Sequence, residues 1–186
     1  MRIELISEAE RLPVLLSEVR DFLKISHPDE DAMIAGYIRA ATGACENFIG
    51  RKLIAQKWQL ILNDWGNSGE IQIPLSPVLA IDKMEYWNGT SFQEIAAGDY
   101  LLDNTSYQAK ILPDATSQWP EPDRNVAGIQ IVVSAGFGEG QNDVPHDIRL
   151  GILHWVAAAY EGAGFGDNQT LFMAEKLWQP YRRMVL

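Results

Sequence analysis

The amino-acid sequence predicts an α+β fold in which N-terminal helices and a C-terminal helix pack together, with an antiparallel β meander or small sandwich inserted between them. Apolar residues recur at helical spacing before residue 50, alternate with polar ones in the middle of the chain, and return to helical spacing after Pro145. Because the strands form one block, a parallel βαβ sheet is disfavoured. We expect a single domain with helices over 17–50, a β block over 56–135, a helix over 145–160 and a flexible C-terminal tail over 162–186.

Two helices are expected before the β block. Ser17 is placed to cap a short helix that runs through Ile25, with acidic residues early in it. A longer helix opens near Pro28 and ends at Gly50, which is typical of a C-terminal cap. Its apolar residues form one stripe at steps of three and four: Ile34, Tyr37, Ile38, Ala41, Cys45 and Phe48.

The β block begins near Gln56, where apolar and polar side chains start to alternate. Further short strands are expected over 70–73, 79–87, 92–95, 100–102, 109–112 and 129–133. The Asn88-Gly89 pair indicates a tight hairpin, since both residues tolerate positive φ. Three prolines make 113–125 an irregular loop.

The C-terminal part consists of a helix from Pro145 to about Tyr160 and a tail. Glycines in 162–166 break this helix and predict a hinge over 162–167. The tail ends in a segment over 174–186 that either docks on a partner or packs as a helix on its own core. The sequence leaves both alternatives open.

Composition limits the class of protein. The chain has 186 residues, of which 47% are hydrophobic and 22% charged, as expected of a folded globular protein. Its 15 basic and 25 acidic residues give a net charge of −10, which works against broad binding to phosphate backbones. Cys45 is the single cysteine and cannot form an intramolecular disulfide, which fits a reducing cytoplasm. No stretch reaches the roughly 18 apolar residues of a membrane span, and no secretion signal is recognised.

Catalytic, cofactor and metal sites are not expected. The glycine-rich 136–140 segment follows a strand and precedes a helix, but it lacks the Gly-Lys-Ser/Thr of a phosphate loop and places Glu139 where a phosphate would lie. His27, His146 and His154 are too scattered for a metal constellation. The nucleophile types Ser117, Ser134 and Cys45 lack the surroundings that a nucleophile needs. A small enzyme or ligand-binding domain of unknown substrate is kept as the alternative function.

Two basic and aromatic spots are the remaining candidates for binding. One comprises Arg51, Lys52 and Lys57 near Trp58, and the other groups Lys176, Arg182 and Arg183 beside Trp178 and Tyr181. On an acidic chain such small spots are more often protein contacts than sites for single-stranded nucleic acid.

Several strings in a fixed order resemble the phage head–tail connector family, including the adaptors of gene transfer agents. The N-terminal strings are LSEVRDFL at 16–23, IAGYIRAA at 34–41 and ENFIGRKLI at 46–54. Later pieces agree with the family: the strand with Trp58, the LSPV turn at 75–78, SAGF at 134–137, Val144-Pro145 before a helix, and LWQPYR at 177–182. The resemblance covers most of the chain, although the large β block departs from shorter, all-helical connectors.

The resemblance implies a structural protein that completes the head of a phage or prophage particle. Such an adaptor docks on the portal protein as a homo-oligomeric ring, dodecameric by the resemblance, and meets tail or stopper proteins. DNA passes through the channel without sequence-specific binding, and no membrane is involved. The place of action is the virion neck, after assembly in the host cytoplasm. The residues expected at the partner interface are Lys176, Trp178, Pro180, Tyr181 and Arg182.

Overall fold

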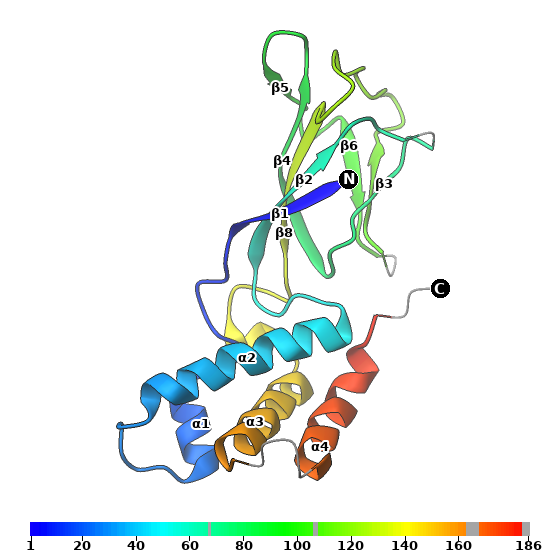
Figure 1. Cartoon of the computed structure of the whole chain (residues 1–186). Helices are drawn as coiled ribbons and strands as arrows, with labels where there is room; N and C mark the ends of the chain where they lie inside the picture. The colour runs from blue at the N-terminus through cyan, green and yellow to red at the C-terminus, as the bar shows by residue number, and fades with distance from the viewer. Residues whose placement is uncertain (67, 106–107, 163–167, 184–186) are drawn as a thin grey trace. The chain divides into compact units, whose positions relative to one another are not determined.

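The computed structural model describes residues 1–66, 68–105, 108–162 and 168–183. The chain divides into two compact units, and each is built from two separate segments (Figure 1). The β unit comprises Met1–Ala9 with Ala55–Phe137, and the helical unit comprises Glu10–Ile54 with Gly138–Leu186. The sequence did not indicate this division, because the segments that form each unit lie far apart along the chain.

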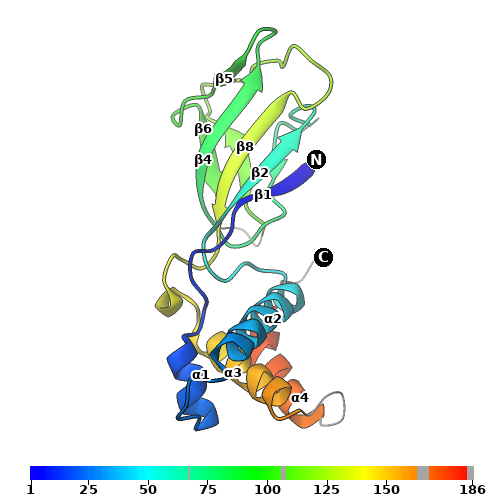
Figure 2. The same ribbon diagram turned by 60° about the vertical axis from the view of Figure 1, so that its left-hand side comes forward.

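The β unit contains a five-stranded antiparallel sheet with the order β1-β2-β8-β4-β5 (Figure 2). The strands are β1 (Arg2–Ser7), β2 (Gln56–Leu62), β8 (Ile129–Ala135), β4 (Val78–Trp87) and β5 (Phe92–Glu94). Strand β8 lies in the centre and alternates between fully buried and half-buried positions. One face of the sheet is therefore core and the other meets solvent, as the alternating sequence predicts. Strand β1 was not expected from the sequence.

A second sheet with the order β3-β7-β6 completes the β unit. It consists of β3 (Ile71–Gln72), β7 (Lys110–Pro113) and β6 (Tyr100–Asp103). Buried side chains from both sheets form one core cluster, in which Leu60, Met84 and Ile131 of the larger sheet pack with Ile71 and Ile111 of the smaller one. Of the two predicted alternatives, an antiparallel β meander or a small sandwich, the structure shows the sandwich.

The proline-containing loop after β7 is fixed by aromatic side chains. The rings of Trp65 and Trp119 stack with centroids 4.6 Å apart. Each indole N–H donates a hydrogen bond to a backbone carbonyl, Trp65 to Pro120 at 2.7 Å and Trp119 to Gly69 at 2.7 Å. Farther along the loop, the guanidinium of Arg124 lies 4.6 Å from the centre of the Trp87 ring. The loop thus has a defined path without regular secondary structure.

The helical unit contains four α-helices, α1 (Leu16–Leu23), α2 (Asp31–Ile49), α3 (His146–Tyr160) and α4 (Asn168–Trp178). Two short 3₁₀ turns, η1 (Gln141–Asp143) and η2 (Gln179–Tyr181), flank the C-terminal pair. The fully buried side chains of the α-helices include Val19 of α1, Ile38 of α2 and Ile152 of α3. The predicted packing of N-terminal helices with a C-terminal helix is confirmed.

Helix ends follow local chemistry, with one difference from the sequence prediction. Ser17 lies inside α1 and does not cap it; the Glu18 carboxylate instead accepts the backbone N–H of Leu15 at 2.7 Å. Gly50 ends α2 as predicted, with φ of 67° and its N–H donating to the Glu46 carbonyl. A glycine suits this position because it has no Cβ to clash at positive φ.

Charged and polar pairs join the helices. Arg20 of α1 donates from Nε to Asp31 Oδ1 of α2 at 2.7 Å. Arg149 of α3 pairs with Glu18 of α1, and the Tyr160 hydroxyl donates to Glu30 before α2. These contacts fix the register of the helices, since each partner comes from a different segment.

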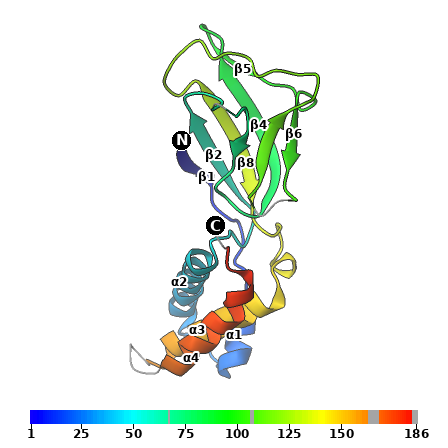
Figure 3. The same ribbon diagram turned by 90° about the vertical axis from the view of Figure 1, so that its right-hand side faces the viewer.

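The C-terminal segment differs from the flexible tail expected over 162–186. Residues 168–182 form α4 and η2, and α4 packs against α2 and α3 (Figure 3). Its Ala174 and Trp178 are buried. The expectation is wrong for this segment, because an apolar face at helical spacing finds a place on the helices formed earlier in the chain. The predicted hinge lies, from 163 to 167, outside the described residues, as do residues 184–186.

Candidate interface site

The three histidines lie in the helical unit, at separate positions along the chain. His27 lies in the segment between α1 and α2, His146 is the first residue of α3, and His154 packs edge-to-face on Phe22 with ring centroids 5.3 Å apart. Within the described ranges no group of three or more His, Cys, Asp or Glu side chains is arranged to hold a metal ion. None of the described helices is long and apolar enough to cross a membrane.

The glycine-rich segment before α3 folds as a turn around its own carboxylate. Asp143 Oδ2 accepts the backbone N–H of Gly140 at 2.8 Å. The same carboxylate lies so close to Gly138 that any side chain at that position would overlap it. The Asp143 carboxylate therefore occupies a backbone donor and puts a negative charge where a phosphate would have to bind, and close packing explains the glycine at 138.

Trp178 is a core residue and not an exposed anchor. It is 2% exposed, and its indole N–H donates to the Ile148 carbonyl of α3 at 3.1 Å. The Phe48 ring of α2 lies 6.0 Å away. Of the five predicted interface residues, Trp178 is thus placed inside the helical unit, because the indole fills the space between α2, α3 and α4.

The other four predicted residues lie on the surface around Trp178. Lys176, Pro180 and Arg182 are exposed and Tyr181 is half-buried. Lys176 Nζ lies 4.4 Å from the centre of the Phe172 ring. Burial, together with the Asp147 carboxylate 3.4 Å from its hydroxyl, raises the pKa of Tyr181 above its ordinary value. We call these four residues the C-terminal surface.

The structure joins basic residues that the sequence placed in two spots. The backbone N–H of Arg183 donates to the Ile49 carbonyl at the end of α2 at 2.7 Å. This bond brings Arg182 and Arg183 to the chain segment that carries Arg51 and Lys52, where Lys52 Nζ lies 2.8 Å from Glu46 Oε2. These four residues form a basic cluster in the helical unit. Only the tertiary structure reveals it, where a Cβ built on Gly50 would lie 3.3 Å from the Cβ of Arg183.

Lys57 does not belong to this cluster. It lies in β2 of the β unit, with its Nζ 3.4 Å from Asp82 Oδ1.

The net charge differs between the two units. The β unit has five Lys and Arg residues against twelve Asp and Glu, a net charge of −7, whereas the helical unit has ten against thirteen, a net charge of −3. Most of the negative charge is therefore carried by the β unit.

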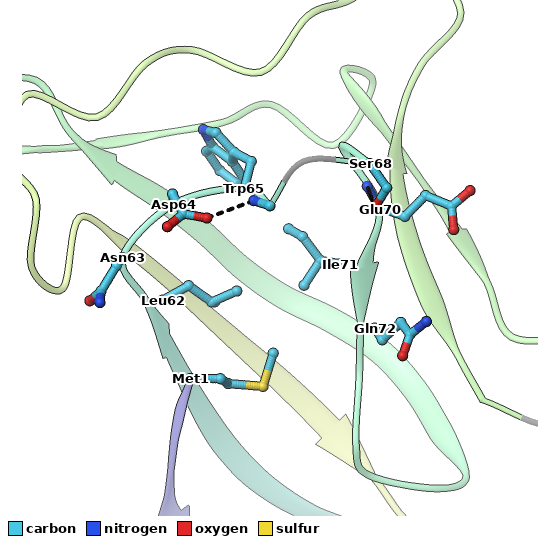
Figure 4. Close-up of a pocket in the computed structure, with 10 residues that line it drawn as sticks. Met1, Leu62, Asn63, Asp64, Trp65, Ser68, Glu70, Ile71 and Gln72 are labelled. Carbon is cyan, nitrogen blue, oxygen red and sulfur yellow. Dashed lines mark hydrogen bonds between the residues drawn. The ribbon is translucent and has the colours of Figure 1, made fainter. Parts of the chain in front are cut away.

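The β unit also has a pocket of about 360 Å³ beside its edge strands (Figure 4). Leu62 and Ile71 supply apolar surface, and Asp64 and Glu70 supply carboxylates. Asp64 Oδ1 accepts the N–H of Gly66 at 2.8 Å, and Glu70 lies 3.2 Å from Lys110 Nζ. No pattern in the sequence predicts this pocket, because Met1 lines it together with residues of 62–66 and 68–72.

Comparisons with known proteins agree with this architecture. The family model of the phage gp6-like head-tail connector protein matches residues 13–118, from the segment before α1 into the proline-containing loop. No curated protein matches the chain.

Solved structures extend the similarity to the whole chain. A chain from the neck of an empty GTA particle, computed with C6 symmetry, has a TM-score of 0.83 at 22% identity. One from the virion of the native gene transfer agent particle has 0.83 at 21%, and one from the neck of the native particle, computed with C12 symmetry, has 0.77 at 24%. Each alignment covers 100% of this chain and 97% of that chain, so the two helices beyond the family match share the fold too. The family model covers more than half of the sequence, and the chain therefore belongs to the phage gp6-like head–tail connector family.

Proposed function

We propose that this head–tail connector acts in the virion neck as a closed ring that docks on the portal protein, and that tail or stopper proteins bind to the ring. The observation that carries the proposal is the family match, supported by a fold shared along the whole chain with subunits of gene transfer agent particles. The two neck structures were computed with C6 and C12 symmetry, and such cyclic symmetry supports a closed ring. The C12 symmetry supports a ring of twelve copies. The connector is incorporated into the particle in the cytoplasm of the cell that hosts the phage or prophage.

DNA passes through this ring without sequence-specific binding. A net charge of −10 supports this part of the proposal, because a negative wall repels the phosphate backbone and lets the duplex slide. The β unit carries most of that charge.

The connector works without catalytic turnover. The support is its family, whose role is structural, together with the separate positions of the three histidines. The alternative of a small enzyme or ligand-binding domain would be favoured by a stoichiometric transition metal in the purified protein whose removal abolished a hydrolytic activity.

The C-terminal surface and the basic cluster contact a partner protein in the neck. Arg182 is exposed and Tyr181 is half-buried, and arginine and tyrosine are enriched at protein interfaces. Docking through a folded helix loses less conformational entropy than docking through a flexible tail would.

Co-sedimentation with purified portal-bearing heads tests the connector role. We expect the protein to sediment with heads and to restore tail joining to heads that lack it. Failure to sediment with heads at any salt concentration would overturn the assignment.

Charge reversal tests the proposed surface. The Lys176→Glu/Arg182→Glu double variant should fold normally but lose most of its binding to heads. The matched control is Arg39→Glu on the exposed side of α2, which should bind as the wild type does. Equal binding by all three proteins would remove the C-terminal surface from the proposal and leave the connector role intact.

A further inference from the structure

One side of the β unit ends in two strand edges. Among the described strands, β1 pairs only with β2, and β3 pairs only with β7. Met1, which directly precedes β1, and Leu62 of β2 line the pocket in Figure 4 together with Ile71 and Gln72 of β3, so the start of β1 lies near β3. The edge of the larger sheet and the edge of the smaller sheet thus border the same opening.

Apolar side chains of β1 extend the core-facing side of the larger sheet beyond β2. In the register with β2, Ile3 lies opposite Leu60 and Leu5 opposite Trp58. Leu60 is fully buried in the core, whereas Ile3 is 38% and Leu5 41% exposed. Both apolar side chains therefore face the core side of the sheet at a position that the described part of the chain leaves partly uncovered. Sheet proteins usually shield such an edge, since it offers a template for another strand.

The groups at this opening determine what can fill it. Backbone N–H and C=O groups on the outer side of β1 are matched by another strand, whose alternate side chains would lie over Ile3 and Leu5. The carboxylates of Asp64 and Glu70 at the pocket favour a cation, although Lys110 already pairs with Glu70. A second β unit fits poorly, because two units of charge −7 repel each other.

We propose that β1 is a docking edge for an extended segment of another protein, in which apolar residues alternate with lysine or arginine. The segment adds a sixth strand to the larger sheet next to β1, its apolar side chains cover Ile3 and Leu5, and a basic side chain reaches the pocket at Asp64. This interaction goes beyond the proposed ring, and it uses a surface in the β unit that the C-terminal surface does not include.

A short blocked peptide of alternating valine and lysine is the probe, with the full-length protein as its target. Two comparison peptides have the same length: one carries glutamate in place of lysine, and the other carries N-methyl groups that remove its backbone donors. We expect the first peptide to bind and to slow amide exchange along Arg2–Ser7, and the other two to bind roughly tenfold more weakly or less. Equal binding of the N-methylated peptide would show that binding needs no backbone hydrogen bonds and would overturn the strand pairing.

Matched variants locate the binding. The double variant Ile3→Ser/Leu5→Ser should bind the probe peptide roughly tenfold more weakly, since it removes the apolar contacts without changing the charge. Its control is Leu79→Ser/Leu101→Ser, which changes two leucines of similar or greater exposure on β4 and β6 and should leave binding unchanged. Asp64→Asn should weaken binding by a few-fold, whereas Glu121→Gln in the exposed loop should not.

Two outcomes would overturn the proposal even if the probe binds. If both serine double variants bind as the wild type does, β1 is not the docking edge. If exchange along Arg2–Ser7 slows with increasing concentration of the protein alone, the edge is covered by a second copy and not by a different chain. Sedimentation of Ile3→Ser/Leu5→Ser with portal-bearing heads tests the connector role separately, because that role does not require β1.

Discussion

Gly151 of α3 lies directly under the indole of Trp178. A methyl group built on Gly151 would be 2.8 Å from Cδ1 and 3.0 Å from Cε2 of the Trp178 ring, and closer still to Nε1. The absent side chain allows the indole to approach the α3 backbone and donate its N–H to the Ile148 carbonyl. This pair of residues allows α4 to pack closely on α3.

Gly151→Ala should therefore destabilise the helical unit by about 1–3 kcal/mol, because the added methyl group overpacks the site of the indole. Urea unfolding monitored by circular dichroism measures this change. The control is Gly36→Ala in α2, where a methyl group would meet no atom within 4 Å. That variant should be neutral or stabilising by up to about 1 kcal/mol. The same loss in both variants would contradict the packing argument.

Trp178→Ala should lower the stability of the helical unit by about 3–5 kcal/mol, since a large buried aromatic side chain leaves a cavity. Differential scanning calorimetry provides the measurement. Phe172→Ala on the same helix is the comparison, because Phe172 is 54% exposed and should cost well under half as much. If the two variants melt alike, α4 behaves as an appendage and not as part of the core.

Trp119→Phe should loosen the proline-containing loop, because it removes the hydrogen bond to the Gly69 carbonyl and weakens the stack on Trp65. We expect a cost of about 1–2 kcal/mol. Limited proteolysis should cut the loop over 113–128 faster in the variant. Amide exchange of the helices should be unchanged, and a general increase would indicate global unfolding instead.

The Cys45 thiol should be unreactive in the folded protein. Burial in the α2 stripe, and to a lesser extent the Glu46 charge, raises the pKa of Cys45 far above its ordinary range. A thiol reagent at pH 8 should label the protein only after denaturation.

Because the pKa of Cys45 is raised in the folded state, the free energy of unfolding should decrease at alkaline pH. In the unfolded chain the thiol ionises near its ordinary pKa of about 8.5, whereas the folded state holds it neutral. Stability is therefore present below that pH and lost as pH rises through it. The thermal midpoint should fall above about pH 9, and Cys45→Ala should reduce the fall. A midpoint that rises in this range would show the opposite sign.

The isolated protein should be a monomer or a small oligomer that closes into a ring on the portal. Like-charged protomers repel, and contacts on the order of 1,000 Å² are needed for a persistent interface. Higher salt should promote self-association, because it screens charges beyond a Debye length of about 10 Å at 0.1 M. Sedimentation velocity across a salt series measures this. A stable ring at low salt without portal would refute templating by the portal but not the connector role.

The sequence by itself determined the α+β class, the strand segments from Gln56 onward and the ends of α2 and α3. These features depend on local chemistry: the period of apolar residues, Gly50 at positive φ and Pro145 before His146. The family resemblance was also readable, since it rests on short strings in a fixed order, and the family model confirms it.

Only the tertiary structure decided where surfaces lie. Trp178 was expected at a partner interface because its residue type is common there, but Gly151, far away in sequence, gives it a buried place. Arg51 and Arg183 became neighbours through one backbone hydrogen bond to Ile49. Strand β1 formed because β2 offered an edge to a short alternating segment at the start of the chain. Burial and strand pairing depend on residues distant in sequence, so a local pattern can predict an element and its apolar face but not which side chains of that face stay uncovered.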